Sequence, residues 1–282
     1  MTTDYQEPAE TPTVVIEPRG GWRIVDWQEI VEYRDLFLFL IWRQIRGRYA
    51  QSALGISWAI IQPLVMVGVF TVVFGNLAEI ESDGVPYAIF SFAAMTPWTY
   101  FQNALQGATE SLVGQANMVA KIYFPRMMLP ISAVLARLVD FTIALLILGG
   151  FLVWYQMVPN WTALFLPFLI ILMMMSAAGV GMFLTAMAIQ FRDIKHAMTF
   201  AVRLLMYLAP VVYPVSLIPE QYRLIYALNP MVGVIEGFRA SLLSTTPMPW
   251  DLIGVGAVSG IFIFLGGAMY FKRMERVFAD VA

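Results

Sequence analysis

Six long apolar stretches, separated by short polar connections, run through the chain. They span roughly residues 54–78, 86–109, 127–155, 161–189, 197–218 and 251–271. A helix needs about 20 mostly apolar residues to cross the hydrocarbon core of a bilayer, and each stretch is long enough. The pattern predicts an all-α integral membrane protein with six transmembrane helices, contained in a membrane domain at residues 51–275.

Basic residues gather in every second connection between these stretches. Six arginines lie between Arg19 and Arg48, before the first stretch, whereas residues 79–85 contain three acids and no base. Basic residues return at Lys121, at Lys195 and from Lys272 onward, and the exception to the alternation is the segment 219–250, which contains Arg223 and Arg239. Because cytoplasmic loops of membrane proteins are enriched in Lys and Arg, we expect both termini to be cytoplasmic.

Residues 26–50 form a separate element before the first apolar stretch. Asp26 to Glu29 match a capping box, which marks the start of a helix. One face of that helix is mostly charged and the other apolar, so we expect an amphipathic helix in the cytoplasmic interface. Its predicted apolar face consists of Ile30, Val31, Leu38, Ile41, Trp42 and Ile45. We expect residues 1–25 to form a disordered acidic tail, and residues 276–282 a cytoplasmic tail.

The segment 219–250 is apolar but too interrupted to cross a membrane. Its longest uncharged run, residues 224–235, has 12 residues, with Asn229 and Pro230 in the middle. Proline suits the first turn of a helix and asparagine the position that caps it. We expect a re-entrant hairpin of two short helices that dips into the membrane from outside. A folded external loop is the alternative.

Charged side chains in membrane segments are candidates for function, because burying them in lipid is costly. Arg137 and Asp140 lie three residues apart in the third stretch, and Glu236 and Arg239 have the same spacing in the hairpin segment. Each pair is placed to neutralise its charges on one helix face. For Arg137 and Asp140, a role in transport is the alternative.

Two of the apolar stretches contain residues that predict a local departure from a simple membrane helix. Pro210 and Pro214 each remove a backbone hydrogen bond, which predicts a break in the outer half of the fifth stretch. Small residues at 176–181 in the fourth stretch favour the close approach of another helix.

The connection 114–128 is more hydrophobic than an exposed loop needs to be. One stripe of a short helix gathers the apolar residues Met118, Val119, Ile122 and Tyr123. Such a helix needs a surface on which to dock. The residues alone leave open whether that surface belongs to this chain or to a partner.

The composition excludes several classes of function. A net charge of −2 provides no polycationic surface for nucleic acid. The chain has no cysteine and one histidine, His196, so it lacks thiolate sites and histidine clusters for metals. It contains no G-x-x-x-x-G-K-[ST] motif for ATP and no paired carboxylates or histidine base for a membrane enzyme. We therefore expect a non-catalytic chain without a cofactor or metal of its own.

A series of short motifs follows in a fixed order over about residues 30–275. They are Arg46-Gly47-Arg48-Tyr49, Ser52-Ala53-Leu54-Gly55, Trp58, Gln62-Pro63-Leu64, Asn117, the run Lys121 to Arg126, Leu129-Pro130, the run Phe191 to Ile194, Pro210, Val212-Tyr213-Pro214, Asn229-Pro230 and Phe238-Arg239. This ordered set resembles the type-two ATP-binding-cassette permeases that export polysaccharides.

The resemblance implies a half-channel that pairs with a second copy of itself in the bacterial inner membrane. Two separate nucleotide-binding ATPase subunits, which use ATP and Mg, would bind on the cytoplasmic side. The implied substrate is a polysaccharide on a polyprenyl-pyrophosphate lipid, such as O-antigen. The implied contacts of the ATPase are Asn117, Met118, Lys121, Ile122, Tyr123, Phe124 and Arg126. The implied external gate contains Tyr222, Tyr226, Asn229, Pro230, Glu236 and Arg239.

Two further sets of residues are candidates for contact with the substrate. Arg43, Arg46 and Arg48 end the interface helix where a lipid pyrophosphate would enter, and arginine binds phosphate through two parallel hydrogen bonds. Anchoring to acidic membrane lipids is the alternative for these arginines. Aromatic rings that hold sugars weakly are expected to line the channel, and the candidates are Trp98, Tyr100, Phe101, Tyr207 and Tyr213. Their alternative is the aromatic belt at the membrane interface.

Other functions are still open at this point. The exported polymer could be capsule or teichoic acid. A secondary transporter would need intramembrane acids for ion coupling, and Asp140 is the only acid deep in a predicted span. A membrane-embedded enzyme acting on glycans or lipids is a further alternative, which the absence of a base disfavours.

Overall fold

The computed structural model describes residues 31–50, 55–119, 121, 123–191 and 193–275, and the regular structure in these ranges is entirely helical. The α-helices are α2 (Arg34–Tyr49), α3 (Trp58–Phe70), α4 (Tyr87–Ser111), α5 (Ala116–Val119), α6 (Met128–Ala136), α7 (Leu138–Trp154), α8 (Leu166–Gln190), α9 (Ile194–Tyr207), α10 (Glu220–Tyr226), α11 (Pro230–Leu243) and α12 (Trp250–Glu275). Tighter or wider turns are η1 (Gly55–Ser57), η2 (Thr71–Leu77), η3 (Val113–Gln115), η4 (Trp161–Phe165) and η5 (Val215–Leu217). The all-α class is thus confirmed for the described residues. The capping box at 26–29 and both predicted tails lie outside them.

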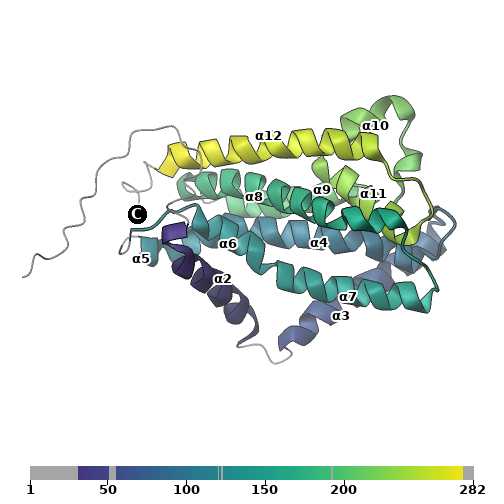
Figure 1. Cartoon of the computed structure of the whole chain (residues 1–282), viewed down its shortest axis with the longest axis horizontal. Coiled ribbons are helices and arrows are strands. Elements are labelled where there is room, and N and C mark those ends of the chain that lie inside the picture. Colours follow the sequence, from purple (N-terminus) through teal and green to yellow (C-terminus); the bar gives the residue numbers. More distant parts are fainter. Residues whose placement is uncertain (1–30, 51–54, 120, 122, 192, 276–282) are drawn as a thin grey trace, which may run out of the picture.

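Four helical segments in the described part of the chain are long and apolar enough to cross a membrane. They are Trp58–Leu77, Met128–Trp154, Trp161–Gln190 and Trp250–Glu275. These segments match the first, third, fourth and sixth predicted spans. In Figure 1 the helices α12, α8, α4 and α7 lie side by side along the long axis of the bundle, with α5 at one end and α10 at the other.

The second predicted span corresponds to α4, which is less apolar than the four segments above. Its 25 residues rise about 38 Å, enough to cross a core of about 30 Å. Most of its side chains are buried among α6, α7, α8 and α11. Because protein rather than lipid surrounds α4, polar residues such as Asn103 are tolerated in this helix.

The fifth predicted span, residues 197–218, is helical only in its first part. Helix α9 begins earlier, at Ile194, and ends at Tyr207 after 14 residues. That length rises only about 21 Å, less than the hydrocarbon core. The chain then turns through Pro210, which has no N–H to continue the helix, so the break expected from the prolines is confirmed.

The third span bends at Arg137, which separates α6 from α7. The backbone N–H of Arg137 donates to the carbonyl of Val134 at 3.3 Å, a tighter turn than that of an α-helix. The bend brings the Arg137 side chain toward α4, where Gly107 leaves space for it.

Small residues allow α8 to pack very closely on its neighbours. A Cβ atom at Gly267 of α12 would lie 2.0 Å from the carbonyl oxygen of Gly179. A Cβ atom at Gly181 would lie 2.6 Å from the Cβ of Ala108 in α4. The close approach predicted from residues 176–181 is therefore confirmed, with α12 and α4 as the partners.

The interface helix α2 is apolar on two sides, so its division into one polar and one apolar face is incomplete. Leu36, Phe37 and Leu40 pack toward the protein, where α2 contacts α6. Leu38 and Trp42, from the predicted apolar face, are 61% and 51% exposed. Two apolar sides suit a helix that rests between protein and lipid.

Candidate functional site

The loop between α4 and α6 lies at the end of the bundle where α12 also ends (Figure 1). The backbone N–H of Arg126 donates to the Glu275 carboxylate at 3.3 Å, and its guanidinium donates to the Glu275 carbonyl at 3.1 Å. The loop is thereby fastened to the last turn of α12. These two contacts join the loop to a helix that is long and apolar enough to cross a membrane.

The predicted apolar stripe of this loop is divided between protein and solvent. Val119 and Phe124 are buried and Met118 is half-buried, whereas the Tyr123 side chain is 68% exposed. Lys121 is also exposed. Ile122 and the side chain of Asn117 lie outside the described part of the structure. Among the residues of the stripe that the structure describes, Tyr123 is therefore the one whose side chain is mostly exposed.

The three arginines at the end of α2 reach different partners. Arg43 donates to the Met118 sulfur at 3.6 Å, which links α2 to α5. The Arg46 guanidinium lies 5.0 Å from the ring centre of Trp42 on its own helix. Arg48 contacts the Asp140 carboxylate of α7. They do not converge on one point, so they do not form a single phosphate clamp.

A cavity of about 240 Å³ lies between α2, α3, α4 and the α6–α7 bend. Its polar lining includes Arg48, Tyr49, Gln62, Thr96, Thr99, Asn103, Arg137 and Asp140. Its less polar lining includes Gly55, Trp58, Ala59, Pro63, Phe92, Met95, Tyr100, Phe141 and Ala144. The cavity is therefore amphipathic, with a charged side and an apolar side.

Asp140 is the centre of the charged side of this cavity. Its carboxylate contacts the Arg48 guanidinium and accepts a hydrogen bond from the Tyr49 hydroxyl. The Arg137 guanidinium lies 3.6 Å from the same carboxylate, as the three-residue spacing predicted. Desolvation by partial burial, followed by the bond to Asp140, raises the pKa of Tyr49 to about 12, so its phenol stays protonated and continues to donate. This cluster ties α2 to α7.

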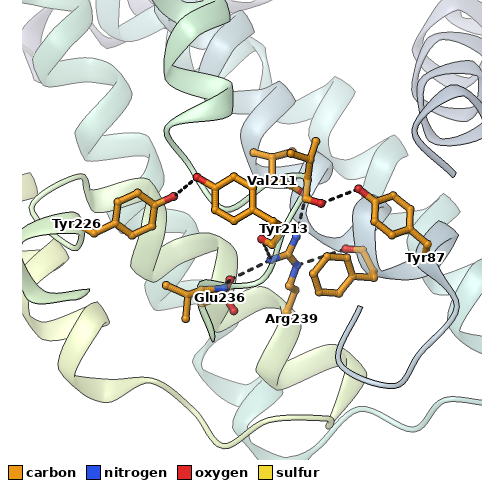
Figure 2. A network of polar contacts seen from close by, with 9 residues as sticks. Tyr87, Val211, Tyr213, Tyr226, Glu236 and Arg239 are labelled. Carbon is orange, nitrogen blue, oxygen red and sulfur yellow. Dashed lines mark hydrogen bonds and ion pairs between the residues drawn. The ribbon is translucent and has the colours of Figure 1, made fainter. Parts of the chain in front are cut away.

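A second polar network lies near the hairpin from α10 to α11, around Arg239 of α11 (Figure 2). The Arg239 side chain is 1% exposed and pairs with Glu236 at 2.9 Å. It also donates to the carbonyls of Val211 at 2.8 Å and Tyr213 at 3.2 Å. Its guanidinium lies 3.7 Å from the ring centre of Phe90. One side chain thus joins the hairpin, the turn after α9 and α4.

The hairpin itself is built as its sequence predicts. The Asn229 side chain accepts from the N–H of Met231 at 3.1 Å, and Pro230 opens α11. Helix α11 is buried along its whole length, whereas Tyr222 of α10 is 54% exposed. The Tyr226 and Tyr213 hydroxyls lie 3.0 Å apart (Figure 2). Helix α11 is therefore an integral layer of the bundle, whereas α10 lies at its surface.

The predicted channel aromatics divide into three groups, and for the first the prediction is wrong in this structure. Trp98 and Phe101 are 2% and 6% exposed and belong to the core of one subunit, because α4 is enclosed by other helices. Tyr100 lines the cavity and donates to the Val134 carbonyl at 3.0 Å. Tyr207 is 53% exposed, and the hydroxyl of the half-buried Tyr213 donates to its carbonyl at 2.9 Å. Only these last two stay candidates for an open channel surface.

Sequence reasoning missed some residues that the structure brings into these networks. The Tyr87 hydroxyl donates to the Val212 carbonyl at 2.7 Å and so supports the turn that Arg239 also holds (Figure 2). Gln44 of α2 donates to Ser132 of α6 at 3.2 Å. Neither contact has a local sequence signal, because the partners lie 125 and 88 positions apart. Tyr49 was marked only by its place in a motif.

Comparison with known proteins places these elements in a family. Residues 35–243 match the family described as ABC-2 type transporter, which is more than half of the chain. The chain belongs to the ABC-2 transporter family. With four candidate spans in the described residues, this ABC-2 chain is a multi-pass membrane protein. Permeases of the ABC-2 family are non-catalytic membrane subunits that pair with ATPase subunits.

Several curated ABC-2 relatives cover most of the chain. The O-antigen export system permease protein RfbA of Myxococcus xanthus is 26% identical over 88% of this chain and 96% of its own length. The polysialic acid transport protein KpsM of Escherichia coli is 24% identical over 85% of this chain and 93% of its own length. The capsule polysaccharide export inner-membrane protein CtrC of Neisseria meningitidis is 26% identical over 76% of this chain and 83% of its own length.

Proposed function

We propose that this ABC-2 chain is the membrane subunit of an exporter that moves lipid-linked polysaccharide of the O-antigen type across the bacterial inner membrane. The observation that carries the proposal is the similarity to an O-antigen export permease over 88% of this chain and 96% of that relative. The family match over residues 35–243 also contains most of α2, the loop between α4 and α6, and the hairpin from α10 to α11.

In this proposal the chain crosses the membrane six times and has both termini in the cytoplasm. Four crossings are the apolar segments, and α4 is long enough to be another. The remaining crossing combines α9 with the turns that follow it, where Arg239 and Tyr87 bind the backbone carbonyls of residues 211–213. Irregular backbone at membrane depth is tolerated where protein groups satisfy its hydrogen bonds, and these contacts support that arrangement.

The coupling loop would receive the ATPase subunit at the cytoplasmic end. The outward position of Tyr123 supports this role, since an apolar ring presented at a loop suits a cleft in a partner. The bonds from Arg126 to Glu275 would carry the motion of the ATPase into α12. Two such chains and two ATPase subunits, which use ATP and Mg, would make the complete transporter.

At the opposite end, the hairpin from α10 to α11 would act as the external gate. The contacts of Arg239 with Glu236 and with the carbonyls of Val211 and Tyr213 join α11 to the turn after α9, and they support a gate in which these two parts stay together. Arg43 and Arg46 stay candidates for contact with the lipid pyrophosphate of the substrate, because their contacts leave them near the surface of α2.

Export of a capsular polysaccharide is the second candidate. The relatives KpsM and CtrC, which are named for polysialic acid and capsule, match over 85% and 76% of this chain. Both candidates share a long glycan that must pass through the permease.

The test is a deletion of the gene in its native host. We expect lipid-linked glycan to accumulate on the cytoplasmic face and disappear from the cell surface, and the intact gene to restore export. Chemical analysis of the retained glycan distinguishes O-antigen from capsule. Normal amounts of both surface glycans in the deletion strain would refute the proposed function.

A further inference from the structure

The charges that line the cavity between α2, α3, α4 and α7 do not balance. Two guanidinium groups, from Arg48 and Arg137, face one carboxylate, from Asp140. No other acid is present among the lining residues that the structure describes. The cluster therefore carries a net charge of +1 within the membrane domain, where an uncompensated charge is costly.

Of the two arginines, Arg137 is the one whose guanidinium N–H groups are still available to hydrogen-bond an anion. Asp140 already contacts Arg48 and accepts from Tyr49. The nearest Arg137 nitrogen lies 3.6 Å from that carboxylate, which is an ion pair but too long for a hydrogen bond. Its Nε atom is buried beside Gly107 of α4 and has no hydrogen-bond partner in the described structure, but the side chain as a whole is 22% exposed and lines the cavity. A guanidinium has five N–H donors, and they suit an anion with several oxygens.

The rest of the lining indicates what accompanies the anion. Phe92, Met95 and Phe141 provide an apolar wall beside the charged cluster, and Thr99 and Asn103 provide hydrogen-bonding groups between the two. The volume of about 240 Å³ is below the range of sites that enclose a whole drug-sized ligand. It suits a head group whose remainder extends out of the cavity.

The outer wall of the cavity indicates the route of entry. Helix α3 contributes Trp58 and Gln62, and both are exposed on the surface of the subunit. In the apolar segment Trp58–Leu77, which begins with α3, only 11% of an 18-residue stretch is buried inside the subunit. This wall is therefore open on the single subunit, and in our proposal a molecule that resides in the bilayer reaches the cavity beside it.

We propose that this cavity binds the phosphate head group of a membrane amphiphile, with Arg137 and Arg48 holding the phosphate and the apolar wall holding the first carbons of the lipid. If the amphiphile is the isoprenoid carrier of the glycan, this inference rests on the proposed function. If it is a bilayer phospholipid, the inference does not depend on the proposed function. Asp140 competes with the ligand for the same two cations.

The experiment measures lipid binding to the purified full-length chain with its ATPase subunit in detergent, by native mass spectrometry. The probes are undecaprenyl phosphate, phosphatidylglycerol and inorganic phosphate. Arg137→Gln should weaken binding of the bound lipid about tenfold, because a charge-assisted hydrogen bond is lost. Asp140→Asn should strengthen it, because the competing carboxylate is gone. Arg34→Gln removes the same charge from an exposed position of α2 and should leave binding unchanged.

The strengthening in Asp140→Asn separates binding from a purely structural role, which predicts only losses. If Arg137→Gln does not fold, Arg137→Lys keeps the charge without the fork and should bind more weakly than the native chain. Preference for undecaprenyl phosphate over phosphatidylglycerol identifies the carrier as the ligand, and the reverse identifies a bilayer lipid. Equal lipid binding by the native chain, Arg137→Gln and Asp140→Asn would overturn the proposal. Charge-dependent binding without glycan export would refute only the proposed function.

Discussion

Arg239→Met removes the central cation of the network around α11. The arginine side chain is 1% exposed, so no water replaces the lost donors without a rearrangement. It pairs with Glu236 at 2.9 Å and donates to the carbonyls of Val211 at 2.8 Å and Tyr213 at 3.2 Å. Methionine fills much of the same space but donates nothing. The variant therefore leaves a buried carboxylate without its cation and two turn carbonyls without this donor.

The expected loss follows from these contacts. Removing one partner of a buried ion pair costs about 3–5 kcal/mol, and each unsatisfied buried carbonyl adds about 1–3 kcal/mol before the structure relaxes. We expect a loss of at least about 4 kcal/mol in the free energy of unfolding. The double variant Glu236→Gln, Arg239→Met removes the stranded charge, while its amide oxygen can still accept from the N–H of Val215, which donates to Glu236 at 3.2 Å. It should recover about 2 kcal/mol of the loss.

The assay is reversible unfolding in mixed micelles of dodecyl maltoside and sodium dodecyl sulfate, followed by tryptophan fluorescence. Arg34→Met is the control, because the Arg34 side chain is 73% exposed and such substitutions change stability by about 0.5 kcal/mol or less. A loss below about 1 kcal/mol for Arg239→Met would refute the reasoning. A double variant less stable than Arg239→Met alone would also refute it.

Three other predictions test the topology, the coupling loop and the helix packing. A single cysteine introduced as Ser82→Cys should react with an impermeant thiol reagent in intact cells, whereas Asp193→Cys should not, and the reverse result would contradict the topology. Tyr123→Asp should reduce co-purification of the ATPase subunit, because a charge in an apolar contact costs several kcal/mol; unchanged recovery would count against the loop as the docking site. Gly267→Ala should destabilise the chain by about 1–3 kcal/mol, because the new Cβ atom would overlap the α8 backbone. The control Gly266→Ala should be tolerated, because its Cβ atom would have nothing within 4 Å. Equal melting temperatures of the two variants would show that the helices are not packed this closely.

Features with a local physical cause could be predicted from the sequence. The Asn229–Pro230 start of α11, the break near Pro210 and the three-residue spacing of Glu236 and Arg239 each depend on neighbouring residues, and each is present. The small residues at 176–181 also predicted close packing, because only glycine and alanine allow it.

Features that depend on the packing of distant helices could not be predicted from the sequence. The aromatic ring of Trp98 suggested contact with a channel or with the membrane interface, but the residue is in the core, because neighbouring helices enclose α4. The pairing of Arg48 with Asp140 joins positions 92 residues apart. The sequence therefore suggested a lipid phosphate for Arg48 and a partner only within the third span for Asp140. Their meeting in one cavity required the structure.

The central claim is that this chain moves a lipid-linked glycan only together with an ATPase subunit. The most direct measurement is transport in proteoliposomes that contain the purified chain, its ATPase subunit and lipid-linked O-polysaccharide, with translocation followed by accessibility to an added glycosidase. We predict translocation that requires ATP and both proteins, and none with either protein alone. Translocation by this chain without the ATPase subunit, driven by an ion gradient, would contradict the account.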